Sequence, residues 1–230
     1  MNKFWLGVVS ISFALVISCK TQVPYTPNTA FENEVKLLEA KDKTEKYDKN
    51  AVLFIGSSSI RLWKNIATDL APIPVIQRGF GGSNFTDVVH YTPRLVYPHE
   101  FRAVAVFVAN DITGGKKDKT PNQVKDLFKT FVQLIRTKNA NAPIFFIALT
   151  PTPLRWAVWN KASKANDLIE AYSKTQENLY FIKTKDAYLG PDGLPIKTYF
   201  VGDNLHQNAA GYAVWSNIIK KEITEKLNLK

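Results

Sequence analysis

Short apolar runs alternate with amphipathic stretches along most of the chain, and this alternation restricts the possible folds more than any other feature. The helical patterns span about residues 30–46, 122–138, 157–174 and 208–227. The apolar runs, typical of buried strands, are residues 51–55, 74–76, 103–108, 144–149 and 179–182. Strands that alternate with helices form a parallel sheet with helices on both faces. The sequence therefore predicts an α/β fold, a three-layer α/β/α sandwich around a parallel five-stranded sheet.

The N-terminal segment has the pattern of a secretory leader. Lys3 is followed by an uncharged, mostly apolar run over 4–17, which is shorter than the roughly 20 residues of a membrane-spanning helix. Residues 16–19 read Val-Ile-Ser-Cys and resemble the lipobox of bacterial lipoproteins, in which the cysteine is lipidated. The alternative is an ordinary signal peptide that happens to contain a cysteine.

These features predict three parts in the chain: a lipoprotein signal peptide over 1–18, a tether over 19–29 and one folded domain over 30–230. A lipid anchor at Cys19 would attach the protein to a membrane of the cell envelope. Cys19 is the only cysteine, so the chain can form no intramolecular disulfide. It also has no Cys/His cluster with zinc spacing, and we expect no metal and no organic cofactor.

The chain is basic, with a formal net charge of +10 from 30 Lys and Arg against 20 Asp and Glu. Most of the basic residues are lysines scattered along the chain, whereas nucleic-acid readers concentrate Lys and Arg on one face or in one run. This distribution favours a solvated lysine-rich surface and argues against a nucleic-acid partner. Attraction of anionic substrates is the alternative.

Chemically useful residues follow the predicted strands directly. Ser58 comes after the first strand, the glycine-rich run 79–83 after the second, and Asn110 after the third. In open parallel sheets, ligands bind beyond the carboxyl ends of the strands. We therefore expect these residues to meet at one edge of the sheet.

Ser58 lies between a strand and a predicted helix, where free N–H groups at the helix N-terminus favour developing negative charge. The alternative is that the adjacent serines only cap the helix. Asp203 and His206 lie three residues apart before the last helix. In that arrangement the carboxylate can orient the imidazole, which then accepts a proton from a hydroxyl; an Asp capping turn beside an incidental histidine is the alternative.

Acyl transfer also needs hydrogen-bond donors for the oxyanion. The chain offers the backbone N–H groups of Ser58 and Gly82 and the side-chain amide of Asn110. Gly82 lies in Arg-Gly-Phe-Gly-Gly-Ser, which lacks the G-x-G-x-x-G order of dinucleotide sites.

Together these blocks resemble the SGNH hydrolase family, also called GDSL-like lipases and esterases, in a bacterial lipoprotein form. The resemblance rests on Ser58, Gly82, Asn110 and the Asp203-x-x-His206 pair in this order, and extends over about residues 51–215. It implies a flavodoxin-like sheet, a Ser58–His206–Asp203 triad and an oxyanion hole from Ser58, Gly82 and Asn110. Two residues depart from the family pattern: Ser57 replaces the Asp of G-D-S, and Val108 replaces the Gly of G-x-N-D.

The sequence thus predicts a serine ester hydrolase, and we favour a carbohydrate O-acetyl esterase acting on a small ester or an acylated glycan. A lysophospholipase or thioesterase, and a non-catalytic glycan-binding lipoprotein, are the alternatives. Arg155 and Trp156 follow the fourth strand and are possible substrate contacts. A surface salt bridge for Arg155 and simple packing for Trp156 remain open.

Overall fold

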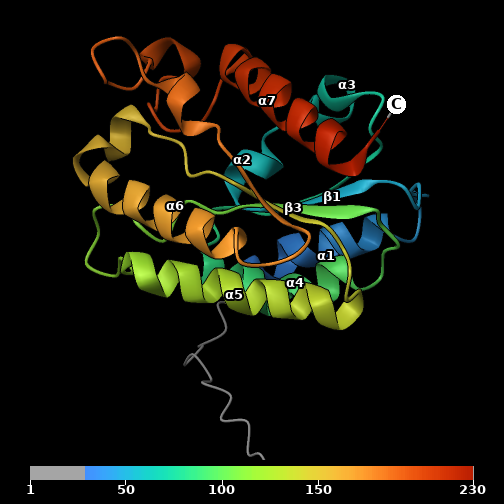
Figure 1. The fold of residues 1–230 in the computed structure, drawn as a ribbon. Helices are drawn as coiled ribbons and strands as arrows, with labels where there is room; N and C mark the ends of the chain where they lie inside the picture. The colour runs from blue at the N-terminus through green and yellow to red at the C-terminus, as the bar shows by residue number, and fades with distance from the viewer. Residues whose placement is uncertain (1–28, 230) are drawn as a thin grey trace, which may run out of the picture.

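Five parallel strands form the central sheet of the computed structural model, which describes residues 29–229 (Figure 1). The strand order is β2-β1-β3-β4-β5, the flavodoxin-like order. This confirms the predicted fold class. The strands are β1 (Val52–Gly56), β2 (Val75–Gly79), β3 (Ala103–Phe107), β4 (Ile144–Ile147) and β5 (Leu179–Ile182).

Helices cover both faces of the sheet, as Figure 1 shows. One layer holds α1 (Glu32–Lys41), α4 (Phe85–Val96), α5 (Pro121–Lys138) and α6 (Trp159–Ser173). The other holds α2 (Ser58–Arg61), α3 (Ile66–Leu70) and α7 (Ala209–Leu227). Short 3-10 turns complete the chain: η1 (Thr29–Phe31), η2 (Pro153–Val158), η3 (Lys185–Tyr188) and η4 (Lys197–Tyr199).

The apolar character of the strands follows from burial on both sides. In β1, Leu53 and Ile55 pack into the core beneath α4 and α5, whereas Val52 and Phe54 pack into the core beneath α7. Because side chains alternate between the two faces of a strand, a run without polar residues is needed when both faces are covered.

Two predicted boundaries were wrong by three residues or more, and the others agree within two residues. The second strand continues to Gly79 instead of ending at 76, because it is an edge strand that tolerates polar residues; Gln77 Nε2 donates to the backbone carbonyls of Ile60 and Trp63. The first helix ends at Lys41 instead of about 46. The residues over 42–46 are all polar, so they have no apolar face with which to extend the helix over the core.

In the sheet, β1 lies between β2 and β3, so the connection after β1 runs to one side and the connection after β2 returns to the other. At such a switch point the connections diverge beyond the carboxyl ends of the strands and leave a crevice for a ligand. Ser58 begins the helix after β1, and Asn110 lies in the loop after β3. The fold therefore brings together residues that are 52 positions apart in the sequence.

The predicted signal peptide, Cys19 and most of the predicted tether lie outside the described residues. Among the helices of residues 29–229, none is both long enough and apolar enough to cross a membrane.

Candidate active site

The turn between β1 and α2 presents Ser58. Gly56 has a φ of +153°, and a Cβ placed on it would lie 2.0 Å from the carbonyl oxygen of Phe107. Only glycine lets the two strand ends approach this closely. Ser57 precedes α2 and makes no side-chain capping bond, while the Ser58 hydroxyl points to His206. The adjacent serines therefore do not act as a side-chain cap.

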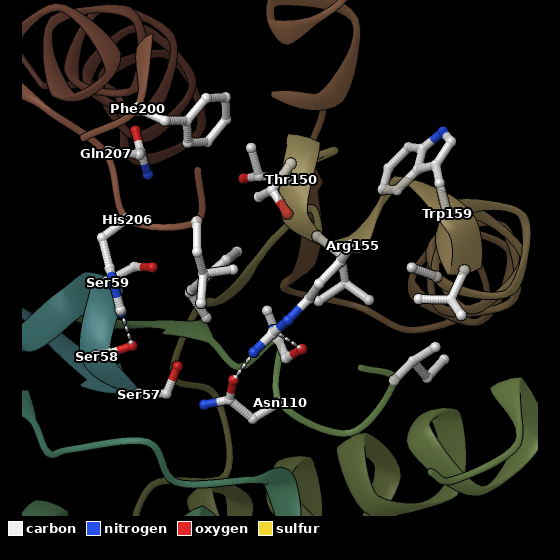
Figure 2. Close-up of a pocket in the computed structure, with 18 residues that line it drawn as sticks. Ser57, Ser58, Ser59, Asn110, Thr150, Arg155, Trp159, Phe200, His206 and Gln207 are labelled. Atoms are coloured by element: carbon white, nitrogen blue, oxygen red, sulfur yellow. Dashed lines mark hydrogen bonds between the residues drawn. The ribbon is translucent and has the colours of Figure 1, made fainter. Parts of the chain in front are cut away.

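Ser58, His206 and Asp203 form a continuous hydrogen-bonded chain. His206 Nε2 lies 3.0 Å from Ser58 Oγ, and His206 Nδ1 lies 2.6 Å from Asp203 Oδ2 (Figure 2 shows the first contact). The carboxylate therefore holds the proton on Nδ1, which leaves Nε2 free to accept the proton of the serine hydroxyl.

Asp203 is held by its own turn. Its Oδ1 accepts the backbone N–H groups of Leu205 and His206, both at 2.9 Å. Burial raises the pKa of the Asp203 carboxyl, but the hydrogen bonds from the ring and backbone of His206 and from Leu205 outweigh burial and lower the pKa below its ordinary value. Because its pKa is lowered, the Asp203 carboxyl is ionised at neutral pH and faces the imidazole as an anion.

The three predicted oxyanion donors are the N–H groups of Ser58 and Gly82 and the side-chain amide of Asn110. The Asn110 Nδ2 atom donates to the carbonyl of Ser83 at 3.1 Å and lies 3.9 Å from where a Cβ on Gly82 would stand. The backbone N–H groups of Ser58 and Gly82 have no acceptor within residues 29–229. Asn110 therefore lies beside Gly82 and lines the same pocket as Ser58, whereas Gly82 itself is not in the pocket wall.

The glycine-rich loop that carries Gly82 is braced from two sides. Glu34 of α1 accepts the backbone N–H of Gly81 at 2.8 Å. On the other side, the Asp111 carboxylate accepts the N–H of Phe85 at 2.9 Å and pairs with Lys119 at 2.9 Å. Asp111 therefore connects the loop after β3 to the start of α4, which follows the glycine-rich loop in the chain.

Arg155 contacts Asn110 through its guanidinium. Its Nη2 donates to Asn110 Oδ1 at 2.6 Å, and its Nη1 donates to the carbonyl of Ala109 at 2.7 Å (Figure 2). Burial lowers the pKa of this guanidinium, and the carboxylates of Asp118 and Asp111 act in the opposite direction. Arg155 makes no ion pair within 4.0 Å among the described residues, so the alternative of a surface salt bridge is wrong.

A pocket that opens to solvent extends from Ser58 and His206 past Arg155. Trp159, rather than Trp156, stands in its wall, and the two indole rings stack with centroids 6.4 Å apart. A substrate contact by Trp156 stays a prediction. The rest of the wall combines apolar and polar residues: Ser57, Ser59, Phe107, Ala109, Asn110, Ile112, Leu149, Thr150, Thr152, Val158, Ala162, Phe200, Leu205 and Gln207.

The model of the GDSL-like Lipase/Acylhydrolase family matches residues 55–214, which is more than half of the chain. The match includes Ser58, Gly82, Asn110, Asp203 and His206. The chain belongs to this family. No curated protein sequence matches the chain significantly.

Solved structures of other acylhydrolases share the fold of this GDSL-like protein. A GDSL-like lipase from Bacteroides thetaiotaomicron is 17% identical with a TM-score of 0.69, covering 84% of this chain and 98% of its own. A carbohydrate esterase family 3 protein from Talaromyces cellulolyticus is 14% identical with a TM-score of 0.61, covering 78% and 98%. Axe2, an acetylxylan esterase from Geobacillus stearothermophilus, is 16% identical with a TM-score of 0.56, covering 76% and 94%.

The two departures from the family pattern are absorbed locally. Val108 is fully buried and packs into the core beneath α4 and α5. Ser57 is buried beside the pocket, and its backbone N–H donates to Phe107 at 3.1 Å. Neither side chain displaces Ser58 from His206.

Sequence reasoning missed Glu34, Phe200 and Gln207. Glu34 is one glutamate among several in an amphipathic helix, and no local signal separates it from its neighbours. Gln207 follows His206 directly and could have been suspected from that position. Within residues 29–229, no three His, Cys, Asp or Glu side chains are grouped so that they could hold a metal ion.

Proposed function

We propose that this GDSL-like acylhydrolase is a serine ester hydrolase with Ser58 as nucleophile, His206 as general base and Asp203 as the partner that orients it. The observation that supports this most directly is the chain of contacts from Asp203 through His206 to Ser58, at 2.6 and 3.0 Å. Ser58 is itself 9% exposed and lines the pocket, so a substrate can reach it.

His206 takes the hydroxyl proton as Ser58 Oγ attacks the ester carbonyl carbon. The carbonyl oxygen becomes an oxyanion between the N–H groups of Ser58 and Gly82 and the Asn110 amide. His206 then passes its proton to the leaving alcohol, and an acyl-Ser58 ester remains. Water, deprotonated by His206, attacks this ester; the acid leaves as His206 returns the proton to Ser58 Oγ.

For the substrate we propose a small acyl ester of a carbohydrate. Support comes from the carbohydrate esterase and acetylxylan esterase that share the fold, and from Trp159, Thr150 and Gln207 in the pocket wall. An indole offers a flat surface for a sugar ring, and the polar groups offer hydrogen bonds. The apolar residues Ile112, Leu149 and Val158 in the same wall support a second candidate, an enzyme for longer acyl chains.

The test is hydrolysis of p-nitrophenyl acetate, butyrate and octanoate by the wild-type protein and by Ser58→Ala. We expect activity that is highest on acetate and falls by roughly 10⁴ or more in the variant. Acetylated xylo-oligosaccharides, followed by acetate release, then test the carbohydrate part. Equal activity in wild type and Ser58→Ala would refute the proposed nucleophile.

The acyl-chain series separates the remaining candidates. A preference for octanoate would favour a lipase, lysophospholipase or thioesterase. Absence of hydrolysis on every ester, together with binding of acetylated glycans, would favour a glycan-binding protein with the same fold.

We also propose that the protein is attached to a membrane of the cell envelope through a lipid on Cys19. Support comes from the lipobox-like residues 16–19 alone, which lie outside the described residues. Intact-protein mass spectrometry on the membrane fraction tests this. We expect the mass of a diacylglyceryl-modified or triacylated N-terminal cysteine in the wild type, and loss of that mass and of membrane association in Cys19→Ser.

A further inference from the structure

The Asn110 amide can serve the oxyanion only in one of its two orientations. An asparagine amide has a donor end, Nδ2, and an acceptor end, Oδ1. With Oδ1 turned to the reacting carbonyl, the amide would repel the developing negative charge. The two ends have nearly the same shape, so neighbouring hydrogen-bond partners must choose the orientation.

Arg155 makes this choice. A guanidinium has only donors, so at 2.6 Å from the amide it can face only Oδ1, as observed. Its second contact, from Nη1 to the carbonyl of Ala109 at 2.7 Å, holds the guanidinium against the same loop (Figure 2). If the amide were turned over while both bonds hold Arg155 in place, the Nδ2 hydrogens of Asn110 would face the N–H groups of the guanidinium.

The other end of the amide is consequently fixed toward the glycine-rich loop. Nδ2 donates one hydrogen to the Ser83 carbonyl at 3.1 Å and lies beside Gly82. A primary amide has two hydrogens, so the second remains for a substrate oxygen. Arg155 also draws electron density from Oδ1, which strengthens the N–H donor at the opposite end of the same amide.

We infer that Arg155 is a positioning residue for the oxyanion donor Asn110, and that its main role is not a direct substrate contact. The inference rests on the proposed function and assigns a further residue to its machinery. Arg155 comes from η2 after β4, and Asn110 from the loop after β3. Their contact therefore keeps two neighbouring loops of the sheet edge in register.

A double-mutant cycle on p-nitrophenyl acetate tests the inference. Arg155→Met is measured in the wild-type and Asn110→Ala backgrounds. In the wild type we expect kcat to fall about 10- to 100-fold with KM within about twofold, because the loss is part of the 10²–10³ that an oxyanion donor contributes. In Asn110→Ala the same change should lower kcat less than about threefold, since the group on which Arg155 acts is gone.

Arg155→Lys and Arg136→Met are the controls. Lysine keeps a charge and one donor, so Arg155→Lys should recover part of the lost kcat. Arg136 is also half-buried, and it does not line the pocket of Ser58. Its guanidinium donates to the backbone carbonyls of Ala140, Ala142, Glu177 and Asn178. Arg136→Met should lower the unfolding temperature and leave kcat unchanged, which separates positioning from a loss of stability.

A measurement without activity distinguishes this inference from the proposed function. The side-chain NH₂ signals of Asn110 in a ¹H–¹⁵N spectrum are identified by their absence in Asn110→Ala. We expect them to shift in Arg155→Met and to stay in place in Arg136→Met. If they shift while Ser58→Ala keeps full activity, the proposed function fails and the positioning of the amide stands.

Three outcomes would overturn the inference. Equal losses of kcat in both backgrounds would mean that Arg155 acts independently of Asn110. A rise in KM at unchanged kcat would return Arg155 to the role of a substrate contact. Unmoved Asn110 signals in folded Arg155→Met would contradict the contact itself.

Discussion

The two sides of the candidate site are built in different ways. On the proton-transfer side, Asp203 and His206 lie three residues apart, and Asp203 Oδ1 accepts two N–H groups of the same turn. On the proposed oxyanion side, Gly82 and Asn110 come from separate loops, and the contacts that hold these loops come from Glu34, Asp111 and Arg155. The first side is built mainly within one turn, to which η2 adds one bond from the Leu154 N–H to the Asn204 carbonyl at 3.0 Å, whereas the second is assembled from distant parts of the chain.

This difference determines how each side should respond to substitution. A local turn keeps its shape when remote contacts are lost, so only its own residues matter greatly. An assembled set of donors depends on each connection that holds its loops together. Substitutions well outside the pocket should therefore affect the oxyanion side and leave the proton-transfer side intact.

The largest expected effect is on the local side. His206→Ala removes the base that accepts the Ser58 proton, and we expect kcat on p-nitrophenyl acetate to fall by at least about 10⁴. His90→Ala, on the exposed surface of α4, is the matched control and should stay within about twofold. A small loss in His206→Ala would contradict the assignment of the base.

Asn110→Asp should have the next largest effect. Aspartate keeps an oxygen for Arg155 but has no N–H, and its charge repels the oxyanion. We expect kcat to fall at least about 10²–10³ with the fold retained. The measurement is kcat on p-nitrophenyl acetate, together with a thermal unfolding curve that checks the fold. Asn160→Asp, at an exposed position of α6, is the control. An active Asn110→Asp enzyme would remove Asn110 from the oxyanion hole.

Glu34→Ala tests whether a residue outside the pocket supports the assembled side. Loss of the carboxylate leaves the Gly81 N–H without its acceptor and loosens the loop of Gly82. We expect kcat to fall about three- to tenfold, in line with roughly 1 kcal/mol for one hydrogen bond. Glu39 is on the same helix, with a side chain 34% exposed against 33% for Glu34, and pairs with Arg94. Glu39→Ala should lower stability alone; an equal kcat loss in both variants would contradict a specific role for Glu34.

The smallest expected effect concerns acid stability of the local turn. Because the pKa of Asp203 is lower in the folded protein, the unfolded chain binds more protons in acid. The stabilising contribution of the Asp203 carboxylate is complete above the pKa of an unfolded aspartate, about 4, and is lost as the pH falls through the lower pKa of Asp203 in the folded protein. Urea unfolding at a series of pH values should show the difference between wild type and Asp203→Asn shrinking below about pH 4. A difference independent of pH would contradict the lowered pKa.

The sequence predicted the site as far as short-range patterns extend. Ser58 follows a buried strand and His206 follows Asp203 by three residues, so local patterns marked them as candidates, and the resemblance to the family supplied their proposed roles. Glu34 and Arg155 act on residues 47 and 45 positions away. No local pattern connects such pairs, and the sequence therefore suggested a substrate contact for Arg155 where the structure shows a contact to Asn110.

The sequence by itself determined the α/β class, the order of the strands along the chain and the turn of Asp203 and His206, because hydrophobic periodicity and hydrogen bonds over three residues are local properties. Only the tertiary structure decided the length of the edge strand β2, the placement of Trp159 in the pocket and the orientation of the Asn110 amide. Each of these depends on which distant residue packs against it, and parallel strands bring such residues together only when the whole sheet has formed.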